Sequence, residues 1–236
     1  MSADPRAVRA MFARIAPRYD LLNRLLSARC DVRWRRRAVA MLPPGGGLAL
    51  DLACGTGDLG LAALALRRAA AIVGCDACLP MLQAGRRRWR GLPFRPLVGD
   101  ALRLPFPDRG FDAAMLAYGW RNFCDPRAAL AELRRVLRPG GHLLILEFFR
   151  PQRPWPRLFY RGVARRLFPL VGGWVAGDAA AYRYLACSVD GFLSVAEADA
   201  LLASCGFRTR RWRAFAGGIS HAVAAVADGV REPAPP

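Results

Sequence analysis

The sequence lacks lysine altogether, and it contains only two histidines among its 236 residues. All 36 basic residues are therefore arginines, and with 18 acidic residues they give a formal net charge of +18. The absence of lysine indicates a compositional bias, because function rarely excludes one residue type everywhere. The excess of arginine predicts a surface that attracts polyanions, either nucleic acid or an anionic lipid surface. The arginine clusters at 33–37 and 86–90 are typical of solvated helix faces, although nucleic-acid binders carry similar patches.

Long apolar runs and paired cysteines are also missing. No apolar run approaches the roughly 20 residues that cross a bilayer, and the first residues hold no apolar core of a secretory signal, so we expect a cytoplasmic protein. The seven cysteines are an odd number and are scattered, which argues against a disulfide framework. Cys75 and Cys78 have redox or zinc spacing, but no second pair exists, and His142 and His221 are the only imidazoles. We therefore predict no metal site.

The remaining composition, with 54% hydrophobic and 10% aromatic residues, is that of a globular chain whose length requires only one domain. Strand-like segments alternate with helical patterns, which predicts a mainly parallel α/β sheet. The expected strands are 47–54, 70–76, 94–100, 111–119 and 142–148, followed by a hairpin of 207–216 and 219–227. The expected helices are 58–68, 79–90, 126–137 and 194–205.

We expect one domain, residues 1–236, with five parts. They are a helical segment (1–44), a cofactor-binding core (45–148), an insertion on the substrate side (149–193), a helix with the hairpin (194–227) and a disordered tail (228–236). The apolar residues of the first part follow a helical pattern: Val8, Met11, Phe12, Ile15, Leu22, Leu25 and Leu26. The insertion mixes arginines with aromatic residues that we expect to be exposed, at Arg150, Arg153, Trp155, Arg157, Phe159 and Tyr160.

A glycine-rich loop lies in the segment LDLACGTGDLG. Its pattern, Gly55-x-Gly57-x-x-Gly60, directly follows a predicted strand and opens a predicted helix. This placement matches the dinucleotide-binding fingerprint, and Asp76 ends the next strand, where a ribose-binding acid belongs. The ligand is still open at this point, because Asp51 and Asp58 flank the loop with negative charge that suits a pyrophosphate poorly.

The acids at the strand ends favour S-adenosylmethionine as the ligand. Their charge suits its ammonium and sulfonium groups, while the helix N-terminus can accept its carboxylate. Asp76 can accept both ribose hydroxyls, and Asp100, at the end of the third strand, can meet the adenine amine. Ligands of open α/β sheets collect at these strand ends. We therefore predict an S-adenosylmethionine site that includes Asp51, Gly55 and Gly57 as well.

The sequence resembles the C-methyltransferases of ubiquinone and menaquinone biosynthesis over about residues 8–219. The resemblance is carried by MFARIAPRYDLLNRLLS, LDLACGTGDL, LPFPDRGFDAAMLAYGWRN, RVLRPGGHLLILEF and GDAAAYRYLACSV. The glycine loop and RVLRPGG occur in many methyltransferases, whereas APRYDLLNRLLS, GWRN and AYRYL are typical of this family. The segments EFFRPQRP and GGISHAVAAV depart from the family pattern. These departures concern the edge of the substrate chamber and not the cofactor site.

The resemblance implies a class I S-adenosylmethionine-dependent methyltransferase that methylates a ring carbon of a polyprenylated quinol. Its fold would be Rossmann-like, with a mainly parallel seven-stranded sheet and a C-terminal antiparallel hairpin. The positions that match cofactor contacts in the family are Thr56, Asp76, Asp100, Ala101 and Ala117. Asp100 stands where several members have asparagine, and Ala117 stands where others have serine.

The segment AYGWRNFCDP contains the pair that the resemblance places beside the quinol, Arg121 and Asn122. Carbon methylation needs an electron-rich ring carbon, so Arg121 would hold a developing phenolate and Asn122 would orient the other ring oxygen. Tyr19, in APRYD, is the N-terminal candidate for the same chamber. Ordinary structural roles stay open, namely a loop-bracing salt bridge for Arg121 and a satisfied core tyrosine for Tyr19.

The implied partners are the polyprenylated quinol and, peripherally, an anionic membrane surface at the cytoplasmic side. Other enzymes of quinone biosynthesis or a second copy of the chain are compatible partners, and we expect no nucleic acid. The charge also allows a nucleic-acid methyltransferase, but neither an Asn/Asp-Pro-Pro-aromatic motif nor a suitably placed catalytic cysteine is present. A noncatalytic cofactor-binding scaffold is the remaining alternative, and the intact glycine loop and GWRN argue against it. The motifs do not distinguish naphthoquinol from benzoquinol.

Overall fold

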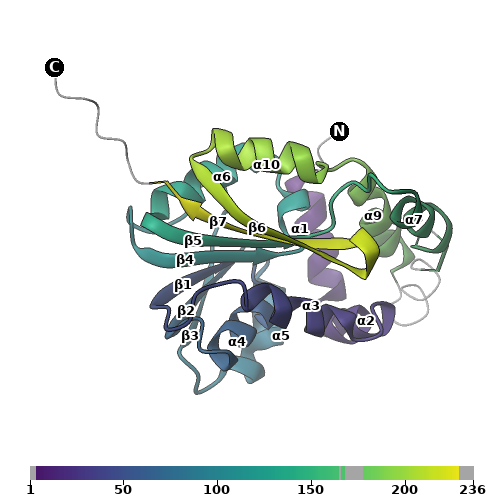
Figure 1. Ribbon diagram of the computed structural model, residues 1–236. Coiled ribbons are helices and arrows are strands. Elements are labelled where there is room, and N and C mark those ends of the chain that lie inside the picture. Colours follow the sequence, from purple (N-terminus) through teal and green to yellow (C-terminus); the bar gives the residue numbers. More distant parts are fainter. Residues whose placement is uncertain (1–3, 165, 168–177, 229–236) are drawn as a thin grey trace.

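The fold is built on one seven-stranded sheet, seen in a computed structural model that describes residues 4–164, 166–167 and 178–228. The strand order is β3-β2-β1-β4-β5-β7-β6, and only β7 runs antiparallel to its neighbours (Figure 1). The strands are β1 (Leu48–Leu52), β2 (Ala71–Asp76), β3 (Phe94–Val98), β4 (Phe111–Ala117), β5 (Leu137–Glu147), β6 (Phe207–Phe215) and β7 (Ser220–Ala227). The predicted Rossmann-like sheet with its C-terminal hairpin is confirmed.

Helices cover both faces of the sheet, because its central parallel strands are apolar on both sides. One core cluster joins the strands to α6 (Pro126–Val136) and α10 (Val195–Ser204). The cluster on the other face contains residues of α3 (Cys30–Val39), α4 (Asp58–Ala65) and α5 (Leu79–Trp89). Figure 1 shows α6 and α10 on one side of the sheet and α4 and α5 on the other.

The strand order reverses between β1 and β4. The chain moves outward from β1 to β3 and then returns to place β4 on the opposite side of β1. At such a switch point the loops after neighbouring strands diverge and leave a crevice at their carboxyl ends. The glycine loop begins at this crevice, directly after β1.

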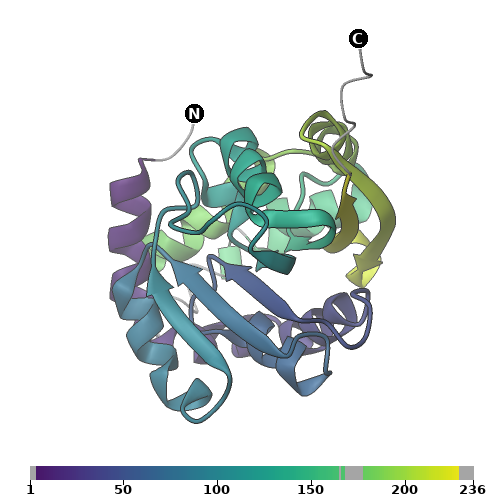
Figure 2. The same cartoon turned by 90° about the vertical axis from the view of Figure 1, so that its left-hand side faces the viewer.

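The N-terminal segment breaks into short helices that lie beside the sheet. They are α1 (Pro5–Ile15), a 3-10 turn η1 (Ala16–Arg18), α2 (Tyr19–Leu26) and α3. Met11, Ile15 and Leu22 are buried, but Leu25, which we expected on the same apolar face, is 54% exposed. The break at Ala16–Arg18 rotates α2 relative to α1, so one continuous stripe does not form. Figure 2 shows α1 beside α5.

Several element ends differ from the predicted ones. The helix expected over 126–137 ends at Val136, because Leu137 already pairs with Phe111 of β4. β5 therefore begins before Pro139, and its irregular first residues include Gly140, which has a φ of +76°. The helices expected over 58–68 and 79–90 end earlier, at Ala65 and Trp89.

The described part of the insertion contains α7 (Pro154–Leu158), the π-helix η3 (Phe159–Ala164) and α9 (Ala179–Asp190), and residues 166–167 are helical as well. Trp155 is 58% exposed, but the expectation that Tyr160 is exposed is wrong. Tyr160 is buried, because its ring packs against Phe148 and its hydroxyl donates to the carbonyl oxygen of Ile219 at 2.9 Å. Part of the predicted insertion, residues 165 and 168–177, lies outside the described residues.

The predicted disordered tail begins one residue too early. The backbone N–H of Asp228 donates to the carbonyl oxygen of Gly206 at 2.9 Å, and the Asp228 carboxylate pairs with Arg208 at 3.6 Å. Asp228 therefore continues the hairpin. The rest of the predicted tail, residues 229–236, lies outside the described residues.

Candidate active site

Two adjoining cavities lie at the switch point. The first cavity, of about 370 Å³, opens at the carboxyl ends of β1, β2 and β4. The second, of about 310 Å³, adjoins the first. Phe12, Tyr19 and Tyr118 line both cavities. A molecule bound in one cavity can therefore approach a molecule bound in the other across a wall of aromatic rings.

Asp76 lines the first cavity, at the end of β2. Its Oδ2 accepts the N–H of Gly55 at 2.8 Å, and its Oδ1 accepts the N–H of Cys78 at 2.8 Å. Burial raises the pKa of Asp76, while these two backbone N–H groups act to lower it. The carboxylate holds the glycine loop in place and keeps further lone pairs for a ligand.

Asp100, Ala101 and Ala117 line the same cavity, at the ends of β3 and β4. Asp100 is exposed, and its Oδ1 accepts the N–H of Leu102 at 2.9 Å in a tight turn. The structure thus brings Gly55, Asp76, Asp100, Ala101 and Ala117 together, as expected for residues at neighbouring strand ends.

Asp51 and Gly57, also predicted to contact the cofactor, do not line this cavity. Asp51 is 1% exposed behind the glycine loop, where Oδ2 accepts the N–H of Gly60 at 2.8 Å and Oδ1 has no partner within the described part of the chain. Burial raises the pKa of Asp51 to about 7. Gly57 has a φ of +82°, and a Cβ there would lie 2.6 Å from Trp89. Asp51 and Gly57 therefore contribute to the conformation of the glycine loop.

Thr56 and Asp58 also face away from the first cavity. The Thr56 hydroxyl donates to Asp20 of α2 at 2.7 Å. Asp58, which we expected to add negative charge to the ligand site, is compensated by three arginines: Arg24 at 3.2 Å, Arg35 at 3.6 Å, and Arg88. Burial acts to raise the pKa of Asp58, but Arg35 and Arg88 outweigh it and hold the pKa below its usual value. This network ties the N-terminal helices to the glycine loop, and the expectation for Asp58 is wrong.

The second cavity is largely apolar. Its wall includes Met11, Phe12, Ile15, Leu26, Trp34, Phe148, Phe159, Tyr160 and Ile219. Two cations also line it, Arg35 and Arg121. Arg35 is paired with Asp31 at 2.6 Å and with Asp58, so its charge is already compensated.

Arg121 is held by three groups and keeps one nitrogen free. Its side chain is 4% exposed, and Nη1 donates to the buried carboxylate of Glu147 and to the carbonyl oxygen of Tyr118, both at 2.7 Å. Nε donates to the hydroxyl of Ser188 at 3.2 Å. Nη2 makes no hydrogen bond to any residue that the structure describes. The loop-bracing salt bridge is therefore present, and the cation still has donors for a ligand oxygen.

Asn122 does not share a cavity with Arg121. It lines the first cavity, its Oδ1 accepts the hydroxyl of Tyr184 at 3.1 Å, and its Nδ2 donates to the Tyr118 carbonyl at 3.4 Å. The expectation that both residues face one ring is therefore not met by their placement. Their backbone forms the 3-10 turn η2 (Trp120–Asn122), in which successive side chains point about 120° apart.

Tyr19 lies in the wall between the cavities, its ring edge-to-face with Phe12 at 6.1 Å. Burial raises the pKa of Tyr19, although Arg35 and Arg121 act to lower it, so the phenol is neutral at physiological pH. Its position between the cavities fits the chamber predicted for it.

Two residues of the site, Glu147 and Tyr184, were not predicted from the sequence, whereas Tyr118 belongs to the aromatic segment AYGWRNFCDP. Tyr118 has a φ of +60°, which is unusual for a bulky residue, and its ring stacks on Phe148 at 4.4 Å. Glu147 is the fully buried partner of Arg121, and Tyr184 bonds Asn122. AYRYL and the strand containing Glu147 were visible in the sequence, but pairing them with Arg121 and Asn122 required the fold.

Within the described ranges, no group of three histidine, cysteine or acidic side chains could hold a metal ion. Cys75 and Cys78 are both free thiols in the wall of the first cavity. Nor is any helix among these residues long and apolar enough to cross a membrane.

The sequence matches the ubiE/COQ5 methyltransferase family over residues 1–227. A demethylmenaquinone methyltransferase of Thermus thermophilus is 50% identical over 203 residues, covering 85% of this chain and 92% of that protein. The ubiquinone/menaquinone biosynthesis C-methyltransferase UbiE of Syntrophotalea carbinolica is 44% identical over 214 residues, covering 89% of this chain and 90% of that protein.

Solved structures share the fold at much lower identity. A SAM-dependent methyltransferase from Thermotoga maritima has a TM-score of 0.67 and 20% identity, covering 94% of this chain and all of that one. The cyclase SpnF has a TM-score of 0.64 and 17% identity, covering 84% of this chain and 81% of that one. Such a likeness shows the fold alone, since one fold serves several reactions. Together with the sequence match, the relatives show that this chain belongs to the ubiE/COQ5 methyltransferase family.

Proposed function

We propose that this methyltransferase uses S-adenosylmethionine to methylate a ring carbon of a polyprenylated quinol. The substrate is demethylmenaquinol or the corresponding ubiquinone precursor, by analogy with the names of its relatives. The observation that carries the proposal is Arg121, a buried cation in the wall of an apolar cavity, whose Nη2 makes no hydrogen bond to a described residue. That cavity adjoins the one lined by Asp76 and Asp100.

The first cavity suits S-adenosylmethionine. Asp76 keeps lone pairs for the ribose hydroxyls beyond its two backbone bonds, and the exposed Asp100 can accept from the adenine amine. Oδ1 of Asp51 has no hydrogen-bond partner among the described residues, and this acceptor behind the glycine loop favours a cationic ligand in front of the loop. When bound, the cofactor supplies an electrophilic methyl group on its sulfonium.

The second cavity suits an aromatic ring with an ionising hydroxyl. Arg121 Nη2 can donate to the ring oxygen, and this bond strengthens as negative charge develops in a dry site. Burial acts to lower the pKa of Arg121, but Glu147 and the nearby tyrosines more than offset it, so the pKa is raised overall. Arg121 is therefore no base, and the proton leaves the ring by another acceptor, such as water.

We further propose that the enzyme meets its substrate at the inner face of an anionic membrane, because a polyprenyl tail does not diffuse through water. The helix α7 exposes Trp155 by 58% and Leu158 by 67%, and the next residue, Phe159, lines the second cavity. Arg153 and Arg157 are exposed beside them. Aromatic rings at headgroup depth and arginines at lipid phosphates are typical of an interface.

The alternatives receive less support. The second cavity is too apolar to suit a polar base bound to a polyphosphate backbone, and the intact charged residues of both cavities argue against a noncatalytic scaffold. The direct test is to incubate the purified enzyme with S-adenosylmethionine and reduced demethylmenaquinone, and separately with the ubiquinone precursor. Mass spectrometry should detect a singly C-methylated quinone. Methylation of RNA but of neither quinol would overturn the proposal, as would unchanged quinones in cells that lack the gene.

A further inference from the structure

The helix α9 carries two side chains that contact the Arg121–Asn122 pair. Tyr184 donates its hydroxyl to Oδ1 of Asn122 at 3.1 Å. One helical turn later, the hydroxyl of Ser188 accepts from Nε of Arg121 at 3.2 Å. Residues four apart on a helix lie on the same face, so a single face of α9 contacts both members of the pair.

These two bonds restrain Nε of Arg121 and Oδ1 of Asn122, which the other contacts of the two residues leave free to move. Nη1 of Arg121 is fixed by Glu147 and Tyr118, but a guanidinium held only at one nitrogen can still tilt about that end. The bond from Nε to Ser188 fixes a second corner of the planar group, which sets the direction of Nη2. Among the described residues, the side chain of Asn122 has only a long bond of 3.4 Å from Nδ2 to the carbonyl oxygen of Tyr118 besides the bond from Tyr184.

An ion pair and apolar packing hold α9 against α1. Asp178 accepts the N–H of Ala181 at the start of the helix at 3.0 Å, and it pairs with Arg14 of α1 at 2.9 Å. Ala181 is buried against Met11 and Ile15 of α1. The insertion and the N-terminal helices therefore pack together and present Tyr184 and Ser188 to the turn after β4.

We propose that Tyr184 and Ser188 are positioning residues for the methyl transfer. Ser188 aims Nη2 of Arg121 into the second cavity, and Tyr184 holds Asn122 at the edge of the first. This inference rests on the proposed function for its kinetic test. It also gives a role to the segment AYRYLACSV, in which Tyr184 and Ser188 are four residues apart and therefore lie on the face of α9 that makes the two bonds.

The kinetic test uses Tyr184→Phe and Ser188→Ala, each of which removes one hydroxyl. Each should lower kcat about tenfold, with the cofactor dissociation constant unchanged. Ser188→Ala should not lower kcat further in an Arg121→Ala background. Likewise, Tyr184→Phe should not lower kcat further in an Asn122→Ala background. The reason is that each residue acts only through its partner. Ser188→Thr, which keeps the hydroxyl, should restore most of the rate.

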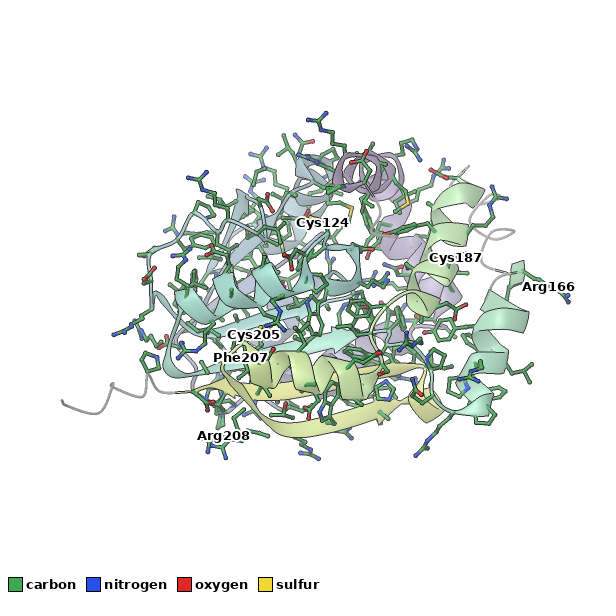
Figure 3. All side chains as sticks on the ribbon, turned by 90° about the horizontal axis from the view of Figure 1, so that it is seen from above. Cys124, Arg166, Cys187, Cys205, Phe207 and Arg208 are labelled. Atoms are coloured by element: carbon green, nitrogen blue, oxygen red, sulfur yellow. The ribbon has the colours of Figure 1, made fainter. Side chains whose placement is uncertain are left out.

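The matched control is Cys187→Ser, an equally small change at an exposed position of the same helix (Figure 3). It should leave kcat unchanged. Losses that add fully in both double variants would show a general structural role and overturn the inference, as would wild-type rates in both single variants.

A second readout does not depend on the reaction. The proton resonance of the Arg121 Nε–H can be assigned by its absence from the spectrum of Arg121→Lys. This proton should exchange slowly with solvent in the wild-type protein. The protection should be lost in Ser188→Ala but kept in Cys187→Ser. Fast exchange in the wild-type protein would overturn the role of Ser188. If the wild-type enzyme methylates no quinol, the proposed function fails, while this measurement still decides the positioning of Arg121.

Discussion

Asp76 combines two tasks, since its carboxylate holds the glycine loop and lines the first cavity. Asp76→Ala should weaken S-adenosylmethionine binding by about 1.5–3 kcal/mol, one to two decades, through the loss of hydrogen bonds to a charged group. Calorimetric titration measures the affinity. Asp108→Ala, at an exposed acid that lines neither cavity, is the control. Equal affinities for the wild type and Asp76→Ala would remove Asp76 from the cofactor site.

Arg121→Ala should lower kcat by roughly 10²–10³ with little change in cofactor affinity, because its bond to the ring oxygen strengthens only as charge develops. The substitution also leaves Glu147 buried and unpaired, which should destabilise the fold by about 3–5 kcal/mol. The companion variant Arg121→Gln/Glu147→Gln removes both charges. Its fold should be more stable than that of Arg121→Ala, and its kcat should be equally low. Arg121→Lys should restore little of the lost kcat, since an ammonium group lacks the planar, forked donors of a guanidinium. A kcat that survives in the double variant would place Arg121 outside the chemistry.

Asp51 should make stability depend on pH. Its pKa rises from 3.8 to about 7 on folding, so between these values the folded state binds a proton that the unfolded chain has lost. The stabilising effect is therefore complete below about pH 4 and is lost as the pH rises through 7. From pH 4 to 8, the unfolding free energy of the cofactor-free wild type should fall relative to that of Asp51→Asn by on the order of 4 kcal/mol. Urea unfolding at both pH values measures this, and parallel changes in the two proteins would refute it.

At the scale of elements, the turn between β1 and α4 depends on the fit of Gly57 against α5. Both Gly57 and Gly91 have left-handed backbones, with φ of +82° and +79°, but a Cβ at Gly57 would lie 2.6 Å from Trp89, whereas one at Gly91 meets nothing within 4 Å. Each change to alanine should cost about 1–2 kcal/mol for the backbone. Gly57→Ala should lose about 1–3 kcal/mol more by overpacking. Thermal unfolding compares the two, and equal losses would mean that Trp89 shifts freely.

For the whole molecule, the charge of +18 and the exposed apolar residues of α7 predict binding to anionic vesicles. Cosedimentation should rise with the content of anionic lipid and fall with salt, since each arginine near the surface adds about 1 kcal/mol. Leu158→Asp should weaken binding, while Leu92→Asp, at an exposed leucine that lines neither cavity, should not. Equal recovery with neutral and anionic vesicles at low salt would defeat this docking without touching the methyltransferase assignment.

The sequence by itself determined the sheet and its hairpin, and it predicted several of the residues that line the first cavity. Alternation of strands and helices predicts a parallel sheet, and the carboxyl ends of parallel strands must meet at one edge. Gly55, Asp76 and Asp100 could therefore be predicted to share one site from their positions at successive strand ends, whereas Ala117 was predicted only from the family resemblance. Motifs local in the chain were sufficient here, because the geometry of the sheet places them together.

The tertiary structure alone decided how the charges are paired and which way each side chain faces. The sequence predicts that Asp58 adds negative charge to the ligand site, yet Arg24, Arg35 and Arg88 approach Asp58 from three separate helices. Arg121 and Asn122 are adjacent in sequence but line different cavities, because neighbours on a 3-10 turn diverge. Partners such as Tyr184, 62 residues from Asn122, are joined only by packing of the insertion on the N-terminal helices. No local periodicity encodes such contacts, since they depend on the path of the chain between them.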